Sequence, residues 1–147
     1  MAKPPSADAP LTDHLAYLLA QASREINRQL ETRLSTEGVP VEQWRILKVL
    51  SDGEGLSMGE LADAVLLNHP TLTKMVDRMV SDSLVYRRQD AEDRRKVLMF
   101  ISDRGKALCK RLNSLAVSQE AHIVENYGGK ATGELKRLLE NLIDAAS

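Results

Sequence analysis

The sequence has little cysteine, few aromatic residues and no long apolar run, and each shortage excludes a class of protein. Its 147 residues include one cysteine, Cys109, so no disulfide can form within the chain. Aromatic residues make up 3% of the chain, too few for the stacking platforms that bind single-stranded nucleic acid. No apolar run approaches the roughly 18 residues of a membrane span, and the N-terminus lacks the apolar segment of a secretory signal. We therefore expect a cytoplasmic domain with no membrane contact.

Charge is nearly balanced over the whole chain but unevenly distributed along it. The formal net charge is −1, which taken alone argues against a nucleic-acid partner. Residues 68–111 nevertheless hold 11 basic and 6 acidic residues, a net charge of +5, and the rest of the chain carries −6. A charged stretch is usually a solvated face, so local structure must decide whether this one binds anything.

Hydrophobic periodicity predicts a mainly α fold with one small β-hairpin. After a loose tail over residues 1–10, helices are expected to begin near residues 11, 41, 57, 68, 102 and 132. The capping residues that we assign to them are Thr12 or Asp13, Ser57, Asn68, Ser102 and Thr132. Gly38 ends the long first helix. Residues 84–88 and 97–101 are rich in β-formers and predict two strands that flank a charged hairpin tip.

The third and fourth predicted helices are separated by a three-residue break, which is the helix-turn-helix arrangement, and the hairpin makes it a winged one. A DNA major groove about 12 Å wide admits one helix, entered by its N-terminal end. That end here carries polar or basic side chains: His69, Thr71, Thr73, Lys74 and Arg78. Arg94 or Arg95 at the hairpin tip can enter a narrow minor groove. In the competing interpretation the helix pair is scaffold and Asp77 only pairs with a neighbouring arginine.

Residues 41–108 resemble the MarR family of bacterial transcription regulators. The resemblance rests on four runs of residues, namely Thr71–Met79, Leu84–Arg87, Asp90–Lys96 and Ile101–Leu108. It implies a homodimeric winged helix-turn-helix protein with N- and C-terminal dimerisation helices. On this basis residues 11–38 and 103–147 form the dimerisation layer, and residues 39–102 form the DNA-binding domain.

The same resemblance assigns roles in DNA binding to individual residues. The major-groove role falls on His69, Pro70, Thr71, Thr73, Lys74 and Arg78. Arg94 takes the wing role, Arg95 and Lys96 support it at phosphates, and Asp93 orients the neighbouring arginines. Ser57 begins the helix that touches backbone phosphate, and Arg87 belongs to the same DNA-contact set.

Two positions depart from the family pattern. Glu92 stands where the family often has arginine, which inverts one charge of the wing. Ser83 stands where the family often has glycine, at the end of the recognition helix. A positive φ at Ser83 would cost about 1 kcal/mol. Neither departure is expected to change the fold.

Many members of the family respond to small aromatic or phenolic ligands that bind between the dimer layer and the winged domain. The candidate lining residues here are His14, Tyr17, Trp44 and Arg45, of which Arg45 would pair with a carboxylate. The competing interpretation places Trp44 in the core. Other members sense oxidants through a cysteine in the first helix. Cys109 lies in the fifth predicted helix, where a buried structural thiol is the simpler interpretation.

The sequence therefore predicts a cytoplasmic, nucleoid-associated repressor that binds double-stranded DNA as a homodimer and is released by a small effector. Oxidant sensing through Cys109 and a winged-helix module that binds protein instead of DNA are the alternatives. The three histidines lie far apart in the sequence, so we expect no metal site and no cofactor. No Gly-rich phosphate loop or Ser-His-Asp arrangement indicates an enzyme.

Overall fold

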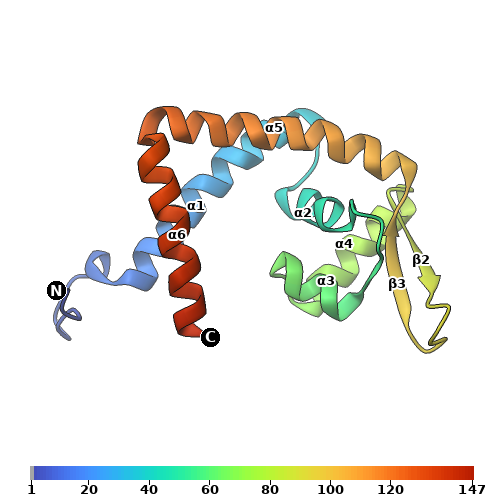
Figure 1. Ribbon diagram of the computed structural model, residues 1–147, viewed down its shortest axis with the longest axis horizontal. Coiled ribbons are helices and arrows are strands. Elements are labelled where there is room, and N and C mark those ends of the chain that lie inside the picture. The colour runs from blue at the N-terminus through green and yellow to red at the C-terminus, as the bar shows by residue number, and fades with distance from the viewer. Residues whose placement is uncertain (1) are drawn as a thin grey trace.

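The computed structural model describes residues 2–147 and has the form of an arch (Figure 1). Helix α5 (Asp103–Tyr127) is the beam of the arch. Helix α6 (Gly129–Ala146) descends from one end of it, and α1 (Leu15–Leu34) descends from near its middle toward the same side; the two helices are called the arm below. Residues 41–101 hang under the other end and are called the winged lobe. Both chain termini lie at the free end of the arm.

The winged lobe contains three helices and a three-stranded antiparallel sheet in the order β1-β3-β2. Its elements in chain order are α2 (Val41–Leu50), β1 (Leu56–Ser57), α3 (Met58–Val65), α4 (His69–Ser81), β2 (Val85–Gln89) and β3 (Val97–Ile101). The helix order, the hairpin and the winged architecture confirm the predicted fold class. The prediction missed β1, which pairs Leu56 with Met99, because a strand of two residues has no periodicity to detect.

Side-chain caps begin three of the helices as predicted. The side chains of Ser57, Asn68 and Ser102 each accept a backbone N–H in the first turn of α3, α4 and α5. Gly38 ends the first helical region with φ 67° after a short 3-10 turn, η2 (Ser35–Glu37). These confirmed boundaries share one property, since each depends on contacts within four residues.

Two predicted helix starts are wrong. Neither Thr12 nor Asp13 caps the first helix, because Leu11–Asp13 forms a separate 3-10 turn, η1, and α1 begins at Leu15. Thr132 does not cap α6, which begins three residues earlier at Gly129. The Thr132 hydroxyl instead donates to the Gly128 carbonyl at 2.7 Å, inside the first turn. In both cases a polar residue with cap chemistry lies beside the true boundary.

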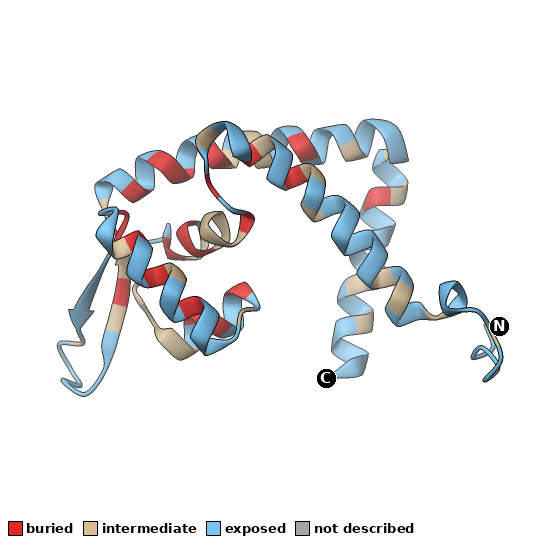
Figure 2. Ribbon diagram, turned by 180° about the vertical axis from the view of Figure 1, so that it is seen from behind, coloured by how far each residue is buried: buried red, intermediate tan, exposed pale blue. Residues whose placement is uncertain are grey.

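The buried apolar residues form one core beneath the beam (Figure 2). Leu47, Leu72 and Met99 have no exposed surface, and Leu108 and Leu112 of α5 close the same core from above. The N-terminal half of α5 therefore packs as part of the winged lobe, although residue 103 was predicted to begin the dimerisation layer. By contrast, Thr132 is the one buried residue of α6.

The start of α5 is held tightly against the sheet. The Ser102 hydroxyl lies 2.6 Å from the Ser83 carbonyl and 2.9 Å from the Leu84 carbonyl. A Cβ on Gly105 would lie 2.2 Å from the Leu84 carbonyl oxygen, a separation that no side chain tolerates. Gly105, which belongs to the run Ile101–Leu108, is therefore required by close backbone approach. Ser83 itself has φ 62°, the conformation whose cost was stated above, and Leu66 has φ 61°.

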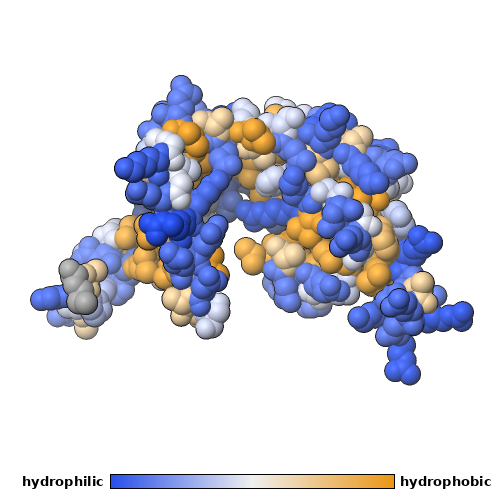
Figure 3. Space-filling view, viewed as in Figure 1, coloured by the Kyte–Doolittle hydropathy of each residue, from blue (hydrophilic) through white to orange (hydrophobic). Residues whose placement is uncertain are grey.

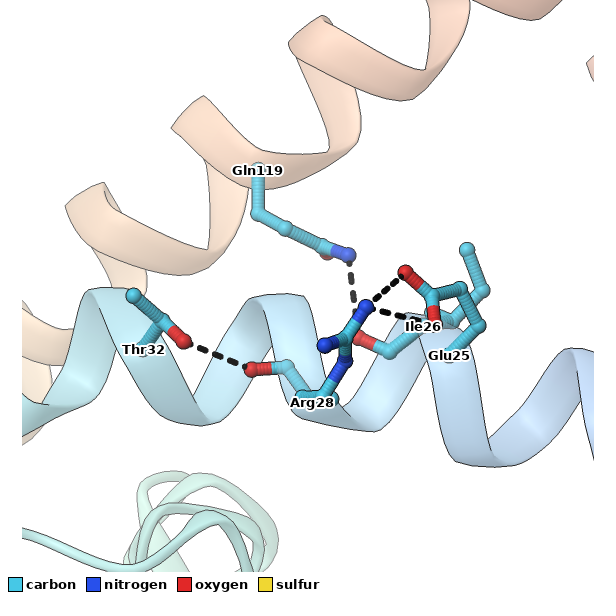
Figure 4. A network of polar contacts seen from close by, with 5 residues as sticks. All are labelled: Glu25, Ile26, Arg28, Thr32 and Gln119. Atoms are coloured by element: carbon cyan, nitrogen blue, oxygen red, sulfur yellow. Dashed lines mark hydrogen bonds and ion pairs between the residues drawn. The ribbon is translucent and has the colours of Figure 1, made fainter.

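Polar contacts fix the crossing of α1 over α5 (Figure 4). The buried Gln119 side chain donates from Nε2 to the Ile26 carbonyl at 3.3 Å. Arg33 donates to the Ser118 hydroxyl at 3.0 Å on the same crossing. On the exposed side of α1, Arg28 pairs with Glu25 at 2.6 Å. The arm is thus attached to the beam at a defined place and angle.

Candidate nucleic-acid interface

The helix-turn-helix is held by two side-chain caps. The Ser57 hydroxyl accepts the Glu60 N–H at 3.2 Å, and the Glu60 carboxylate accepts the Ser57 N–H at 3.3 Å. The hydrogen bonds that the Glu60 carboxylate accepts from Ser57, that of the side chain foremost and then that of the backbone N–H, lower the pKa of Glu60.

Helix α4 presents its polar face because its apolar face is fully buried. Leu72, Val76 and Met79 have no exposed surface and set the rotation of the helix. The side chains predicted to reach the major groove all lie on the exposed part of α4, namely His69, Pro70, Thr71, Thr73, Lys74 and Arg78. Asn68 caps their end of the helix by accepting the Thr71 N–H at 2.9 Å. The free N–H groups of that end and the dipole favour an anion there.

The wing tip carries exposed cations on a braced turn. Arg94, Arg95 and Lys96 are all exposed, and Figure 3 shows hydrophilic side chains projecting from the hairpin. The Asp93 carboxylate accepts the Arg95 N–H at 3.0 Å, and the Asp93 carbonyl accepts the Lys96 N–H at 3.0 Å. Asp93 therefore orients the arginines through the backbone turn. None of the ion pairs formed within residues 2–147 includes its side chain.

Arg87 connects the wing to the recognition helix. Its guanidinium forms a short ion pair with Asp77, on the face of α4 that looks toward β2. The sequence interpretation placed Arg87 among the DNA contacts and left open that Asp77 pairs with an arginine. The structure shows that pairing. Arg87 thus holds the wing against α4 while part of its side chain remains exposed.

A second group of cations surrounds a cavity of about 930 Å³ on the other side of α4. Lys74 and Arg78 of α4 face Arg104 and Arg111 of α5 across it. Arg111 pairs there with Glu37 at 3.1 Å. The sequence analysis did not single out Arg104 or Arg111, although both belong to the basic segment 68–111. Their helical spacing of seven residues places them on one face of α5 and was the available signal.

A smaller cavity of about 280 Å³ lies where α1, α2 and α5 meet. Its polar lining comes from Trp44, Lys48, Asn113, Gln119 and Glu120, and Ile26, Leu30, Ala116, Val117 and Ile123 supply its apolar walls. It thus combines an indole ring and an ammonium group with an apolar interior, as suits a small aromatic acid.

The four predicted effector residues are not brought together. Trp44 lines the small cavity and donates from Nε1 to the Asn113 side chain at 2.9 Å. Arg45 faces α1 instead and donates to the Asn27 side chain at 2.9 Å. His14 and Tyr17, at the other end of α1, do not line the cavity. Lys48 was missed, although its position four residues after Trp44 puts it on the same helical face.

Cys109 is buried, with 2% of its surface exposed. Burial raises the pKa of the Cys109 thiol, and Lys48 and the Asn113 side chain only partly oppose that effect. The thiol is therefore protonated at neutral pH and shielded, unlike the exposed thiolates that react with oxidants. Within residues 2–147, no three metal-ligating side chains form a cluster, and no helix is long and apolar enough to span a membrane.

A winged helix-turn-helix with an exposed polar recognition helix and a cationic wing defines a DNA-binding protein of the transcription-regulator class. A MarR family model matches residues 37–96. The organic hydroperoxide resistance transcriptional regulator of Bacillus subtilis is 31% identical over 98 residues, which are 67% of each chain. This chain belongs to the MarR family.

Other relatives match over most of the chain. The regulator TtmR of Methylorubrum extorquens is 29% identical over 90% of this chain, which spans 65% of TtmR. The homoprotocatechuate degradative operon repressor of Escherichia coli is 26% identical over 89% of this chain and 88% of its own length.

Solved structures share the fold. A MarR family regulator from Silicibacter pomeroyi superposes with a TM-score of 0.82 and 29% identity, over 95% of this chain and all of its own. CouR bound to a 23-mer DNA duplex has a TM-score of 0.83 and 22% identity, over 90% and 94% of the two chains. NadR in complex with 4-hydroxyphenylacetate has a TM-score of 0.77 and 24% identity, over 95% and 97%.

Proposed function

We propose that this chain is a homodimeric repressor of transcription, and that a small aromatic acid releases it from a pseudo-palindromic operator in the bacterial nucleoid. One observation supports DNA binding above all: the N-terminal half of α4 is polar and exposed, and it lies beside a wing tip with three cations. His69, Pro70, Thr71, Thr73, Lys74 and Arg78 read or flank the major groove. Arg94 enters the minor groove, and Arg95, Lys96 and Ser57 contact phosphates.

The arm supports the homodimer. Leu15, Leu18, Leu135, Leu138 and Ile143 expose between 43% and 63% of their surface within one chain. In Figure 3 hydrophobic atoms gather over α1 and α6. An apolar face of this extent is the kind that a second copy covers in a two-fold dimer. Two winged lobes related by that axis would meet half-sites about one helical turn apart.

Replacement of Arg94 by alanine tests the DNA-binding part. The variant should bind a fluorescent duplex of the upstream DNA of its own gene about 1–3 kcal/mol more weakly and keep its thermal unfolding midpoint. The operator affinity of the unaltered protein should fall steeply with salt as phosphate contacts release counterions. Arg28→Ala, on the exposed side of the arm, is the matched control. An Arg94 variant with unchanged affinity would remove the wing role, and a footprint over one asymmetric half-site would remove the dimer.

The small cavity supports the effector part. Lys48 offers a cation to a carboxylate, and Trp44 offers a ring face and an N–H, in a space sized for a single-ring acid. The E. coli repressor is named for the degradation of such an acid, homoprotocatechuate, and NadR was solved in complex with another, 4-hydroxyphenylacetate. The effector of this chain is therefore proposed to be a phenolic or aryl carboxylic acid.

Trp44 is the only tryptophan of the chain, so its fluorescence reports directly on this cavity. We expect 4-hydroxyphenylacetate to change that fluorescence and to weaken operator binding over the same range of concentration. Lys48→Met should bind the acid at least about tenfold more weakly, since a charge-assisted contact is lost. Arg45→Met is the control and should bind it normally. An unchanged Trp44 signal with 4-hydroxyphenylacetate and related aryl acids would reject the effector part.

A further inference from the structure

Helix α2 is joined to the beam α5 by a single polar contact. Trp44 Nε1 donates to Asn113 Oδ1 at 2.9 Å, and within residues 2–147 no other side-chain hydrogen bond links the two helices. The Cys109 thiol donates to the same oxygen from 3.8 Å. The rest of the junction is apolar, where Leu47 and Leu112 are fully buried. Asn113 Oδ1 is therefore the one directional anchor for α2 on α5.

This anchor lies in the wall of the small cavity. Trp44 and Asn113 both line it, beside Lys48. An acid held by Lys48 would place its carboxylate or hydroxyl oxygens within the reach of the Trp44 N–H. A carboxylate is a stronger acceptor for that N–H than a neutral amide oxygen, because charge-assisted hydrogen bonds are roughly twice as strong. An acid in the cavity and the Asn113 side chain therefore compete for the same donor, the Trp44 N–H.

The position of α2 matters to the recognition helix through continuous packing. The buried Ile46, Leu47 and Leu50 of α2 share a core with Leu61 and Val65 of α3. Helix α3 in turn packs on α4, whose exposed face carries the DNA contacts. Because a close-packed core does not deform smoothly, a shift of α2 on α5 moves α3 and α4 with it.

We propose that Asn113 is the positioning residue that couples the cavity to DNA binding. Its bond to Trp44 holds α2 on α5 in the arrangement that binds the operator, and an acid in the cavity takes over the Trp44 N–H and releases that hold. This inference rests on the effector function proposed above. It adds the residue through which the effector acts.

A double-mutant cycle without any acid tests the bond itself. Asn113→Leu keeps the side-chain volume and removes the acceptor, and Trp44→Phe keeps a ring and removes the donor. Each should weaken operator binding about 5- to 10-fold, the effect of one hydrogen bond, and the double variant should be no weaker than either. Asn113→Asp, which keeps an acceptor oxygen, should stay within about 2-fold, as should the neighbouring control Ser114→Ala. Single variants with unchanged affinity, or effects that multiply in the double variant, would overturn the proposal.

A second set of measurements follows the response to 4-hydroxyphenylacetate. In Asn113→Leu, Trp44 fluorescence should report acid binding within about 3-fold of the unaltered protein, but operator affinity should then change by less than about 2-fold. A role confined to stability would lower the unfolding midpoint and leave the response to acid intact, which would also overturn the proposal. If the unaltered protein neither binds nor responds to the acid, the effector function fails, and the acid-free cycle still decides the role of the bond.

Discussion

The winged lobe and the arm contain similar proportions of apolar residues, 28 of 61 and 18 of 38, but use them in opposite ways. In the lobe, the apolar faces of α2, α3, α4 and the sheet converge on one core that the chain closes by itself. In the arm, the apolar faces of α1 and α6 remain largely open, with Leu138 54% and Ile143 63% exposed. The core of the lobe is therefore closed within one chain, whereas the arm leaves open the apolar face that the proposed dimer would cover.

Charge also divides the chain, although not at the boundary between lobe and arm. Residues 68–111, which carry the recognition helix and the wing, hold a net charge of +5, and the rest of the chain holds −6. The near-neutral total conceals this division. Phosphate attracts the basic segment 68–111 and repels the acidic remainder of the chain, so the field of the molecule favours docking through the recognition helix and the wing.

The largest effect on stability is expected from a substitution that creates a new cavity in the core of the lobe. Leu72→Ala should lower the free energy of unfolding by about 3–4 kcal/mol, because Leu72 has no exposed surface and its neighbours cannot fill the space. Urea denaturation measures it. The matched control is the same truncation at Leu66, which is 85% exposed and should cost little. Equal losses at both positions would mean that the lobe has no closed core of its own.

The next effect is expected in the arm, on assembly instead of folding. Leu138→Glu places a charge on the open apolar face and should shift the mass in sedimentation from twice 16.3 kDa toward 16.3 kDa. It should leave the far-ultraviolet circular dichroism of the lobe intact. Lys106→Glu, an equally drastic change on the exposed side of α5, is the control and should leave the mass unaltered. A monomeric unaltered protein would remove the contrast between lobe and arm.

The smallest effect concerns backbone strain, which is confined to the lobe. Among residues 2–147 the two non-glycine residues with positive φ are Leu66 and Ser83. Glycine at either position should raise the free energy of unfolding by about 0.5–1 kcal/mol, since the left-handed conformation then has no Cβ clash. Lys74→Gly, in the exposed middle of α4, should instead lower the free energy of unfolding by about 0.5–1 kcal/mol and serves as the control. A loss of stability in Ser83→Gly would show that other contacts of the serine outweigh the strain.

Sequence reasoning succeeded where a contact is local. The caps at Ser57, Asn68 and Ser102 and the exposed face of α4 depend on residues within a turn or on one helical periodicity. It failed at Thr12 or Asp13 and at Thr132, which have cap chemistry one turn away from the true helix ends.

The small cavity shows why the remaining site residues could not be predicted from the sequence. Trp44, Lys48 and Asn113 are brought together by the crossing of α2 under α5, across 69 residues of sequence in the case of the Trp44–Asn113 bond. Arg45, the neighbouring cation, turns to Asn27 instead. Periodicity places residues on faces, but it cannot say which two faces meet.

By itself, the sequence determined the order of the elements, the winged helix-turn-helix, the family and the exposed polar face of α4, because short-range periodicity, caps and charge encode them. The tertiary structure decided that Arg87 braces the wing through Asp77 and that Gln119 fixes the arm by bonding to the Ile26 carbonyl. It also decided that Lys48, and not Arg45, faces the cavity. These outcomes depend on the angles at which distant helices cross, which are set by packing over the whole core.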